Sequence, residues 1–201
     1  MTMKKNWIIG ITGASGVIYG IRLCEYMLSI GEEIHLVITE AGWRVLHDEL
    51  NWQTIHRQQT LQTYFSQSTG QLIYHPLQDI GASIASGSFR TSGMVIMPCS
   101  MGTLSAIAHG ASDNLLERTA DVMLKEGRPL IIVPRETPLH AIHLENMLRL
   151  AKLGVRLIPA MPAFYHKPET IDELIDFLVG KVLDSMDMEH NLYRRWGEQH
   201  D

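Results

Sequence analysis

The sequence predicts a doubly wound α/β domain, in which helices cover both faces of one parallel sheet. Short apolar runs typical of buried strands recur at residues 7–12, 34–39, 94–97, 130–133 and 155–158. Amphipathic segments long enough to form helices lie between most of these runs. Strands that alternate with helices in this way form parallel sheets through right-handed crossovers.

The first helix can be placed from the spacing of its apolar side chains. Val17, Ile21, Cys24 and Leu28 recur at intervals of three and four residues, which places them on one helical face. Gly31 follows, as glycine often does beyond the C-terminus of a helix. A second helix is expected over residues 40–50, directly after the second strand.

The segment 51–89 is the least regular part of the chain. It is polar, rich in Gln, Ser and Thr, and has one short apolar run at residues 72–74. Clear patterns resume with the strand at 94–97, which Pro98 is expected to close. Helices are then expected around residues 115–123, 140–153 and 171–186, the last with one broad apolar stripe.

Length and composition suit one domain over residues 1–201, which ends in a C-terminal helix and tail at about 170–201. The chain has 17 Lys and Arg against 22 Asp and Glu, a net charge of −5, which argues against a dedicated nucleic-acid binder. Two cysteines, Cys24 and Cys99, cannot build a disulfide framework. No stretch approaches the ~20 apolar residues that cross a bilayer. We therefore expect a soluble, cytoplasmic protein with no membrane or nucleic-acid partner.

Small, hydroxylic and charged residues follow the predicted strands. Ligands of open α/β sheets bind outside the carboxyl ends of the strands, so these loops are the expected site. In order they are residues 13–16, 39–40, 98–103, 134–138 and 159–165.

The turn Gly13-Ala14-Ser15-Gly16 is suited to cradle a phosphate. Its glycines allow close backbone approach, a helix N-terminus offers free N–H groups, and Ser15 adds a hydroxyl. The glycines from Gly10 read G-x-x-G-x-x-G, which differs from the dinucleotide fingerprint G-x-G-x-x-G. The alternative is an ordinary tight turn in which Ser15 caps the helix.

The loop Ser100-Met101-Gly102-Thr103 has the same character. Two such loops at one sheet edge indicate a mononucleotide, with a phosphate and a ring to hold. The alternative is again a helix cap, with Thr103 starting a helix.

Four basic residues could bind a second phosphate. Arg118 and Lys125 lie seven residues apart and share a helical face, Arg135 follows a strand, and Lys181 could complete a cationic pocket. Glu136 would be the carboxylate placed to act there as acid or base. Taken singly, each residue is better explained as a solvated surface charge.

Other reactive residue types favour structural roles. His140 and His143 lie three apart with no third ligand placed by spacing, so capping or surface roles are expected rather than a metal site. Cys99 follows a strand and is expected to be a buried small side chain rather than a nucleophile.

Four motifs together resemble the UbiX-type flavin prenyltransferases. They are G-x-T-G-A-S-G at residues 10–16, I-A-S-G-S-F at 84–89, P-C-S-M-G-T at 98–103 and P-R-E-T-P-L-H at 134–140. The likeness extends from about Lys5 to Trp196. The related cysteine decarboxylases typically carry P-A-S-A-N-T and P-x-M-N at the last two places, which favours prenyl transfer.

The resemblance implies a Rossmann-like flavoprotein fold and a metal-independent reaction. Reduced FMN would accept a dimethylallyl group from dimethylallyl phosphate at N5 and C6, and a UbiD-type decarboxylase that acts on aromatic acids would use the prenylated FMN. It also implies a homo-oligomer, often a dodecamer, with the site where subunits meet. The C-terminal helix and tail, about 170–201, would be used in the oligomer contacts. Neither the donor, monophosphate or pyrophosphate, nor the pathway is fixed by the sequence.

The resemblance also assigns residues, each transferred by its match to a motif. FMN would be bound by Gly13, Ala14, Ser15, Thr39, Ser100, Met101, Gly102, Thr103 and Arg135. The prenyl phosphate would be bound by Lys125, Arg135, Tyr165 and Lys181, with Arg118 nearby. Glu136 would donate a proton to the departing phosphate, with Ser15 and Glu49 supporting proton movement. Lys181 stands where other members have Arg.

Two rival functions stay open at this point. The first is a flavin-dependent decarboxylase that acts directly on an aromatic acid. The second is a non-catalytic flavin carrier, which would need the phosphate loops but not Glu136. Fold alone does not separate the three.

Overall fold

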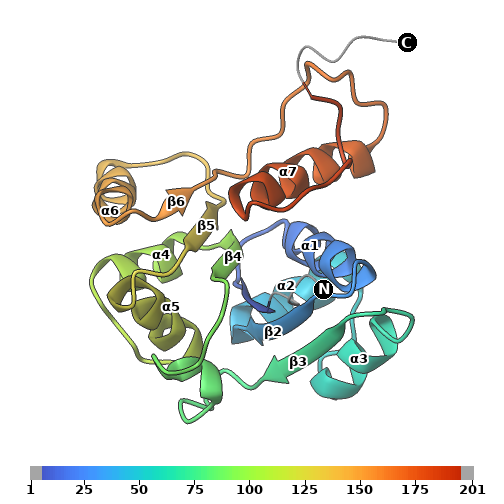
Figure 1. The fold of residues 1–201 in the computed structure, drawn as a ribbon. Coiled ribbons are helices and arrows are strands. Elements are labelled where there is room, and N and C mark those ends of the chain that lie inside the picture. Colours follow the sequence, from blue (N-terminus) through green and yellow to red (C-terminus); the bar gives the residue numbers. More distant parts are fainter. Residues whose placement is uncertain (1–5, 196–201) are drawn as a thin grey trace.

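A six-stranded parallel sheet forms the centre of the computed structural model, which describes residues 6–195 (Figure 1). Its strands lie in the order β3-β2-β1-β4-β5-β6, and every neighbouring pair is parallel. Their bounds are Asn6–Ile11 for β1, Glu33–Ile38 for β2, Gln71–His75 for β3, Met94–Cys99 for β4, Leu130–Pro134 for β5 and Arg156–Leu157 for β6. The doubly wound parallel sheet is therefore confirmed.

Helices connect the strands, and those expected from the sequence lie where the periodicity placed them. Their bounds are Val17–Ser29 for α1, Glu40–Leu50 for α2, Arg57–Tyr64 for α3, Met101–Ala108 for α4, Leu115–Lys125 for α5, Ala141–Lys152 for α6 and Ile171–Ser185 for α7. A short 3₁₀ turn, Ser83–Ala85, precedes β4. None of the helices within residues 6–195 is long and apolar enough to span a membrane.

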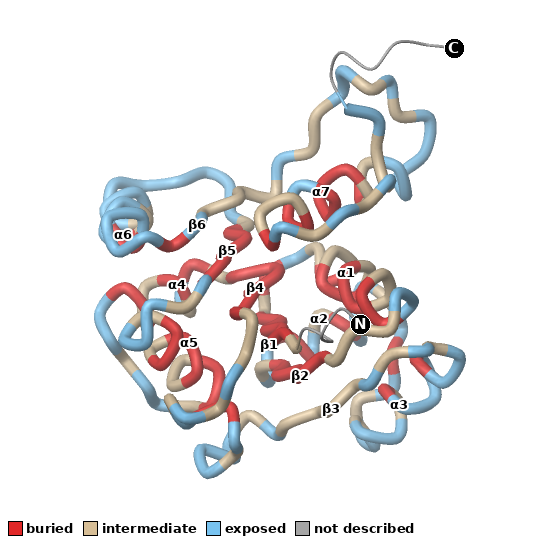
Figure 2. The backbone as a smooth tube through the Cα atoms, in the orientation of Figure 1, coloured by how far each residue is buried: buried red, intermediate tan, exposed pale blue. Residues whose placement is uncertain are grey.

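Alternate residues of the strands face two separate apolar cores. Ile9 and Ile11 of β1 pack with side chains from α1, α2 and α7, whereas Ile8 packs with α4 and α5. The same alternation divides β4 and β5 between the two cores. Figure 2 shows the central strands β1, β2, β4 and β5 as deeply buried. Because both faces are covered, the strands read as continuous apolar runs.

The polar segment 51–89 contains two elements that the sequence did not predict. The helix α3 buries only Leu61, and the edge strand β3 has no fully buried residue. Elements that bury so little apolar surface leave only a weak hydrophobic pattern in the sequence.

Pro98 does not close β4, contrary to expectation, because the strand continues to Cys99. The pairing of β4 with β5 is irregular between Ile96 and Cys99. Proline lacks an N–H group and is tolerated in strands where the regular hydrogen-bond ladder is interrupted.

The two C-terminal helices differ in how they are held. Figure 2 shows α6 as largely exposed, and Ile142, Leu144 and Leu148 are each more than half exposed. By contrast, α7 is fixed to α1 by a two-pronged ion pair, in which Arg22 donates to both oxygens of Asp176 at 2.6 and 3.1 Å. Residues 196–201 of the predicted tail, and Lys5 and Trp196 at the limits of the resemblance, lie outside the described residues.

We expect Gly20→Ala to destabilise the protein even though alanine is the better helix former. Gly20 lies in α1 against β4, and a Cβ at this position would collide with the carbonyl oxygen of Met97. Overpacking of this kind costs about 1–3 kcal/mol, more than the ~1 kcal/mol gained in helix propensity. Denaturant unfolding measures the difference.

Gly102→Ala is the matched control, because a Cβ on Gly102 would meet nothing within 4 Å. Its stability should equal or slightly exceed that of the wild type. A Gly20→Ala variant as stable as the wild type would show that α1 and β4 are not in close contact.

Candidate active site

The carboxyl ends of β1, β2, β4 and β5 meet at one edge of the sheet, where the predicted loops lie together. The chain leaves β1 toward β2 and β3 on one side, and later returns to β4 and β5 on the other. Such a point of reversal opens a crevice between the loops of two adjacent strands, here β1 and β4. The loops 13–16 and 100–103 border this crevice.

A buried hydroxyl joins the ends of β1 and β4. The Thr12 side chain donates a hydrogen bond to the carbonyl of Pro98 at 2.9 Å and accepts one from the N–H of Ser100 at 2.7 Å. Thr12 is fully buried, so neither partner can exchange this bond for water without cost. The two loops that begin at these residues are thereby fixed side by side.

The N-terminus of α1 is occupied by the side chain of Glu49. Its carboxylate accepts hydrogen bonds from the N–H groups of Gly16 at 2.9 Å and Val17 at 3.3 Å. Gly16, with a φ of 93°, is the N-cap, so the interpretation of Ser15 as the cap is wrong, and Ser15 is exposed. Because Glu49 already supplies the negative charge that this helix end attracts, the turn does not offer these N–H groups to a phosphate.

The N-terminus of α4 is open. Ser100 caps it by accepting a hydrogen bond from the Thr103 N–H at 3.3 Å, and its hydroxyl donates to that of Thr103 at 3.1 Å. The helix begins at Met101 rather than at Thr103. The first N–H groups of a helix have no partner within it, so those of Met101 and Gly102 attract anions.

Thr39 and Arg135 complete this edge. Thr39 caps α2 by accepting a hydrogen bond from the Gly42 N–H at 3.0 Å. The Arg135 guanidinium donates to the carbonyl of Ser15 at 3.1 Å. The backbone N–H of Arg135 donates to the carbonyl of Cys99 at 3.1 Å. The segment after β5 is therefore tied to the loops after β1 and β4.

Glu136 and Tyr19 border the same edge. Glu136 is exposed, and its carboxylate accepts a hydrogen bond from the N–H of Thr137 at 2.9 Å. Burial raises the pKa of the Tyr19 phenol, and the positive charge of Arg135 partly offsets that rise. Tyr19 is therefore a neighbour of Arg135 that sequence reasoning did not single out.

Lys125 lies at the opposite edge of the sheet. It is the last residue of α5 and precedes the start of β5 at Leu130, whereas Arg135 follows the end of β5. A five-residue strand spans about 16 Å. One chain therefore does not bring Lys125 and Arg135 to the same small phosphate.

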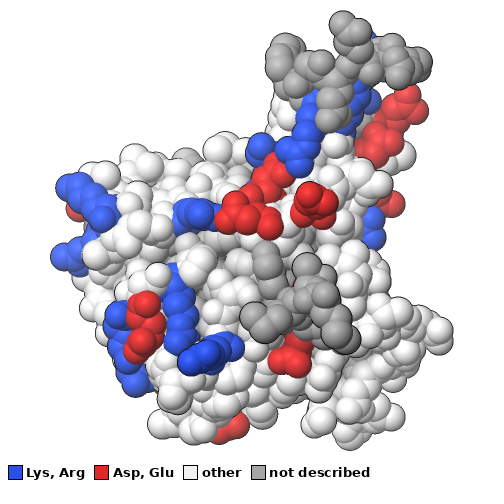
Figure 3. All heavy atoms as spheres, in the orientation of Figure 1, with Lys and Arg blue, Asp and Glu red and all other residues white. Residues whose placement is uncertain are grey.

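A second cluster forms around Lys125. Its amine donates to the carboxylate of Glu126 at 2.7 Å. Arg128 holds the run 84–89 in place by donating to the carbonyls of Gly87 at 2.6 Å and Phe89 at 2.5 Å. Figure 3 shows basic and acidic side chains next to one another over α5 on this face. The I-A-S-G-S-F run and Lys125 are thus neighbours at the amino edge of the sheet, where the strands begin.

The other predicted phosphate ligands also lie apart from Arg135 in sequence and in their contacts. Arg118 pairs with Asp121 at 3.3 Å, and Lys181 lies 3.7 Å from Asp184. Tyr165 lies in the segment that precedes α7 and is 42% exposed. The structure thus brings the predicted FMN ligands to one edge of the sheet, whereas Lys125 lies at the opposite edge of the same chain. The assignment of Lys125, Arg135, Tyr165 and Lys181 to the prenyl phosphate stays a prediction.

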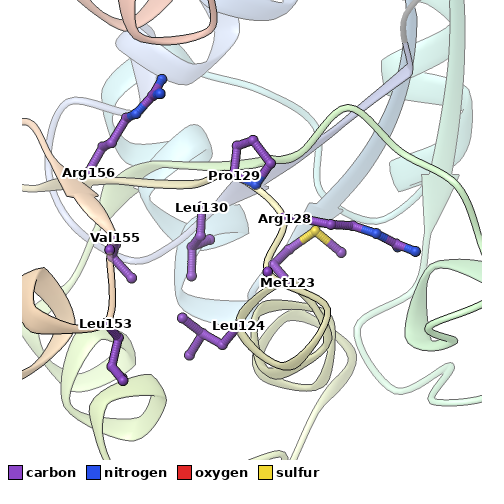
Figure 4. A pocket seen from close by; sticks show the side chains of 10 residues that line it. Met123, Leu124, Arg128, Pro129, Leu130, Leu153, Val155 and Arg156 are labelled. Carbon is purple, nitrogen blue, oxygen red and sulfur yellow. The ribbon is translucent and has the colours of Figure 1, made fainter.

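A pocket of about 260 Å³, lined by both apolar and basic side chains, lies away from these residues (Figure 4). Its lining comes from the end of α5, the start of β5 and the segment after α6, and includes Met123, Leu124, Leu130, Leu153 and Val155. These residues belong to the amino edge of the sheet, so the pocket is not part of the site at the carboxyl edge.

The histidines and cysteines take structural roles. His140 caps α6 by accepting a hydrogen bond from the His143 N–H, which confirms the capping interpretation. Cys99 is fully buried, and burial raises the pKa of its thiol, which suits a core residue rather than a nucleophile. Within residues 6–195, no three His, Cys, Asp or Glu side chains are grouped so as to hold a metal ion.

Comparisons with known proteins identify the family. A family model described as Flavoprotein matches residues 1–183. The chain is 60% identical to the flavin prenyltransferase UbiX of Alkalihalophilus pseudofirmus over 196 residues, which cover 98% of both chains. The chain belongs to the UbiX flavin prenyltransferase family. The resemblance found in its motifs is therefore confirmed.

Two solved structures show that the UbiX fold is shared along the whole chain. The structure of AnUbiX (PadA1) in complex with FMN and dimethylallyl pyrophosphate has a TM-score of 0.89 at 37% identity, and covers 98% of this chain and 100% of that one. A dodecameric FMN-dependent UbiX-like decarboxylase from Escherichia coli O157:H7 has a TM-score of 0.86 at 42% identity, over 96% of this chain and 100% of that one.

We expect Thr12→Val to loosen this UbiX site and to lower the stability of the fold. The valine removes both hydrogen bonds of the hydroxyl and leaves the partly buried N–H of Ser100 without this partner, at a cost of about 1–3 kcal/mol. The Pro98 carbonyl keeps its hydrogen bond from the backbone N–H of Thr12. Denaturant unfolding measures the stability, and fluorescence titration measures FMN affinity, which should fall.

Thr12→Ser is the matched control, because it keeps the hydroxyl and should retain most of both properties. Equal stability and FMN affinity in the valine and serine variants would contradict a role for the hydroxyl.

Proposed function

We propose that this protein transfers a dimethylallyl group from dimethylallyl phosphate to reduced FMN. The observation that carries the proposal is the set of loops that meet at the carboxyl edge of the sheet. The open α4 N-terminus and the Arg135-Glu136 pair lie at one edge, in a chain 60% identical to a flavin prenyltransferase. The α4 N-terminus and Arg135 would bind a mononucleotide at this edge, and Glu136 would be the proton donor.

The residues at this edge fit FMN. The N-terminus of α4 offers N–H groups and the hydroxyls of Ser100 and Thr103 for a phosphate, and no side chain fills the space beside Gly102. Because Glu49 occupies the end of α1, the α4 end is the better place for the phosphate. Gly13, Ala14 and the exposed Ser15, with Thr39 and Arg135, would bind the remainder of the molecule.

Reduced flavin supplies the nucleophilic positions N5 and C6, and the protein supplies the charges. An allylic phosphate that departs without a metal ion needs cationic donors for its developing charge. We assign these to Lys125, Arg135 and Lys181, with the Tyr165 hydroxyl. Glu136 would give its proton to the departing phosphate, and Glu49, beside Ser15, would support later proton movement.

The separation of the cations supports a site that subunits share. Lys125 and Arg135 flank opposite edges of one sheet, so two chains must meet if both are to bind one phosphate. The exposed apolar residues of α6, Ile142 and Leu148 among them, favour such contacts. We propose a closed homo-oligomer, a dodecamer, in which every site repeats by symmetry.

The proposed product, a prenylated flavin, indicates which kind of protein would use it. The family resemblance implies that a UbiD-type decarboxylase uses the prenylated flavin, and we propose such a protein as its recipient. We propose a cytoplasmic location for both proteins.

We expect Glu136→Gln to lower the rate of prenyl transfer at least ~100-fold, because general acid–base groups contribute on that order. FMN affinity should be unchanged, since the predicted FMN ligands stay intact. The measurement is the mass of flavin extracted at timed intervals, with flavin loading checked by absorbance.

Asp79→Asn is the control, an exposed carboxylate in the segment after β3. If Glu136→Gln transferred the prenyl group at the wild-type rate, Glu136 would have no role in the reaction.

We expect two inactive variants to restore one another when their subunits mix. Lys125→Ala removes the cation at the amino edge of the sheet. Glu136→Gln removes the proposed proton donor at the carboxyl edge. In an oligomer assembled from both, about a quarter of the sites would combine two intact halves. Co-expression with two different tags, followed by tandem purification, provides the mixed oligomer. Mixed oligomers no more active than either variant would contradict a shared site.

A further inference from the structure

One carboxylate holds the segment Met188–Arg195 against α7. Asp184 Oδ1 lies 3.1 Å from His190 Nε2 and accepts a hydrogen bond from Arg195 at 2.7 Å. Its Oδ2 accepts a hydrogen bond from the Tyr193 hydroxyl at 2.6 Å. The Lys181 amine lies 3.7 Å from the same oxygen, one helical turn away. Asp184 therefore links a predicted phosphate ligand to the C-terminal segment.

A glycine in the middle of α7 makes this contact possible. Glycine costs about 1 kcal/mol relative to alanine inside a helix, so its presence calls for a reason. A Cβ on Gly180 would lie 2.5 Å from the ring of Tyr193 and 2.7 Å from the ring of His190. The two rings therefore lie directly on the helix backbone, next to Lys181.

Tyr193 also supports Tyr165. The Phe177 ring lies 4.9 Å from the Tyr193 ring and 5.7 Å from the Tyr165 ring, where it makes an edge contact. The Lys181 amine lies 5.8 Å from the centre of the Tyr193 ring. The two predicted phosphate ligands of this part of the chain thus share one support.

We infer that Asp184 and Tyr193 are positioning residues that hold Lys181 and Tyr165 in place for the phosphate of the prenyl donor. The inference rests on the proposed function, which makes these two side chains phosphate ligands. Asp184 and Tyr193 need not touch the donor themselves. They act through the clamp, the contacts of Asp184 and Gly180 with the rings of His190 and Tyr193.

The charge of the clamp suits this role. Burial raises the pKa of Asp184, but hydrogen bonds from Tyr193, Arg195 and His190 outweigh burial and lower that pKa to about 2. The carboxylate is therefore ionised at neutral pH and faces two cations, Lys181 and Arg195.

A positioning role and a purely electrostatic role predict opposite effects for Asp184→Asn. Removal of a negative charge beside Lys181 should strengthen the binding of an anion if Asp184 acts only through its charge. Loss of the clamp should weaken that binding if Asp184 positions its neighbours. The sign of the change separates the two roles.

The test is the dissociation constant of dimethylallyl phosphate, measured by calorimetry on FMN-loaded protein. Tyr193→Phe removes one hydroxyl and keeps the ring and every charge at neutral pH. We expect its dissociation constant to rise about three- to tenfold, the range that the net contribution of one ordinary hydrogen bond gives. FMN affinity should not change. Hydrogen exchange over Met188–Arg195 should become faster.

Two further variants make the test specific. Gly180→Ala should improve the helix yet weaken donor binding, which a merely structural role for α7 would not produce. Tyr64→Phe is the matched control, because the Tyr64 hydroxyl donates to the carboxylate of Glu25 at 2.7 Å in a distant part of the chain. Its donor binding should equal that of the wild type.

The outcomes are distinct. Wild-type donor affinity in Tyr193→Phe and Gly180→Ala, or tighter binding in Asp184→Asn, would overturn the positioning role while the proposed function stands. A flavin-loaded wild-type protein that binds no dimethylallyl phosphate would overturn the proposed function, and the positioning role with it.

Discussion

The hydrogen bonds of Thr12 are the interaction on which the site depends. The sheet reverses its direction of growth between β1 and β4, and nothing in that topology alone fixes the distance between the loops that follow these strands. Thr12 does so: its buried hydroxyl bonds both to Pro98 and to Ser100, and its backbone N–H donates to the carbonyl of Pro98 at 3.2 Å. Arg135 then ties the end of β5 to the same loops through the carbonyl of Ser15. Three loops from distant parts of the sequence thereby form one edge.

The N-termini of α1 and α4 both lie at this edge, but they have different hydrogen-bond partners. This difference indicates which of the two would bind a phosphate. The end of α1 is neutralised by Glu49 of the same chain, whereas the end of α4 has only its Ser100 cap. An incoming phosphate would be repelled by the first and attracted by the second. The glycine-rich turn after β1 is then better suited to contact an uncharged part of the ligand, with Ser15 exposed toward solvent.

Much of the fold could be predicted from the sequence, because buried strands and amphipathic helices leave strong patterns. The edge strand β3 and the helix α3 could not, since they bury too little to leave one. The loops of the site were placed correctly by the rule for carboxyl ends. The bonds of Thr12 to residues 86 and 88 positions away, and of Glu49 to Gly16, depend on the folded chain. The position of Lys125 could have been found, because a helix between parallel strands runs back and must end at their amino edge.

The most direct test of the central claim is the mass of the flavin. Wild-type protein, shown to be loaded with FMN and assembled, is incubated without oxygen with reduced FMN and dimethylallyl phosphate, and the flavin is then extracted. We predict that its mass increases by one dimethylallyl unit, replacing one hydrogen. Unchanged FMN with this donor, and again with dimethylallyl pyrophosphate, would contradict prenyl transfer and leave the site as a flavin-binding site of another function.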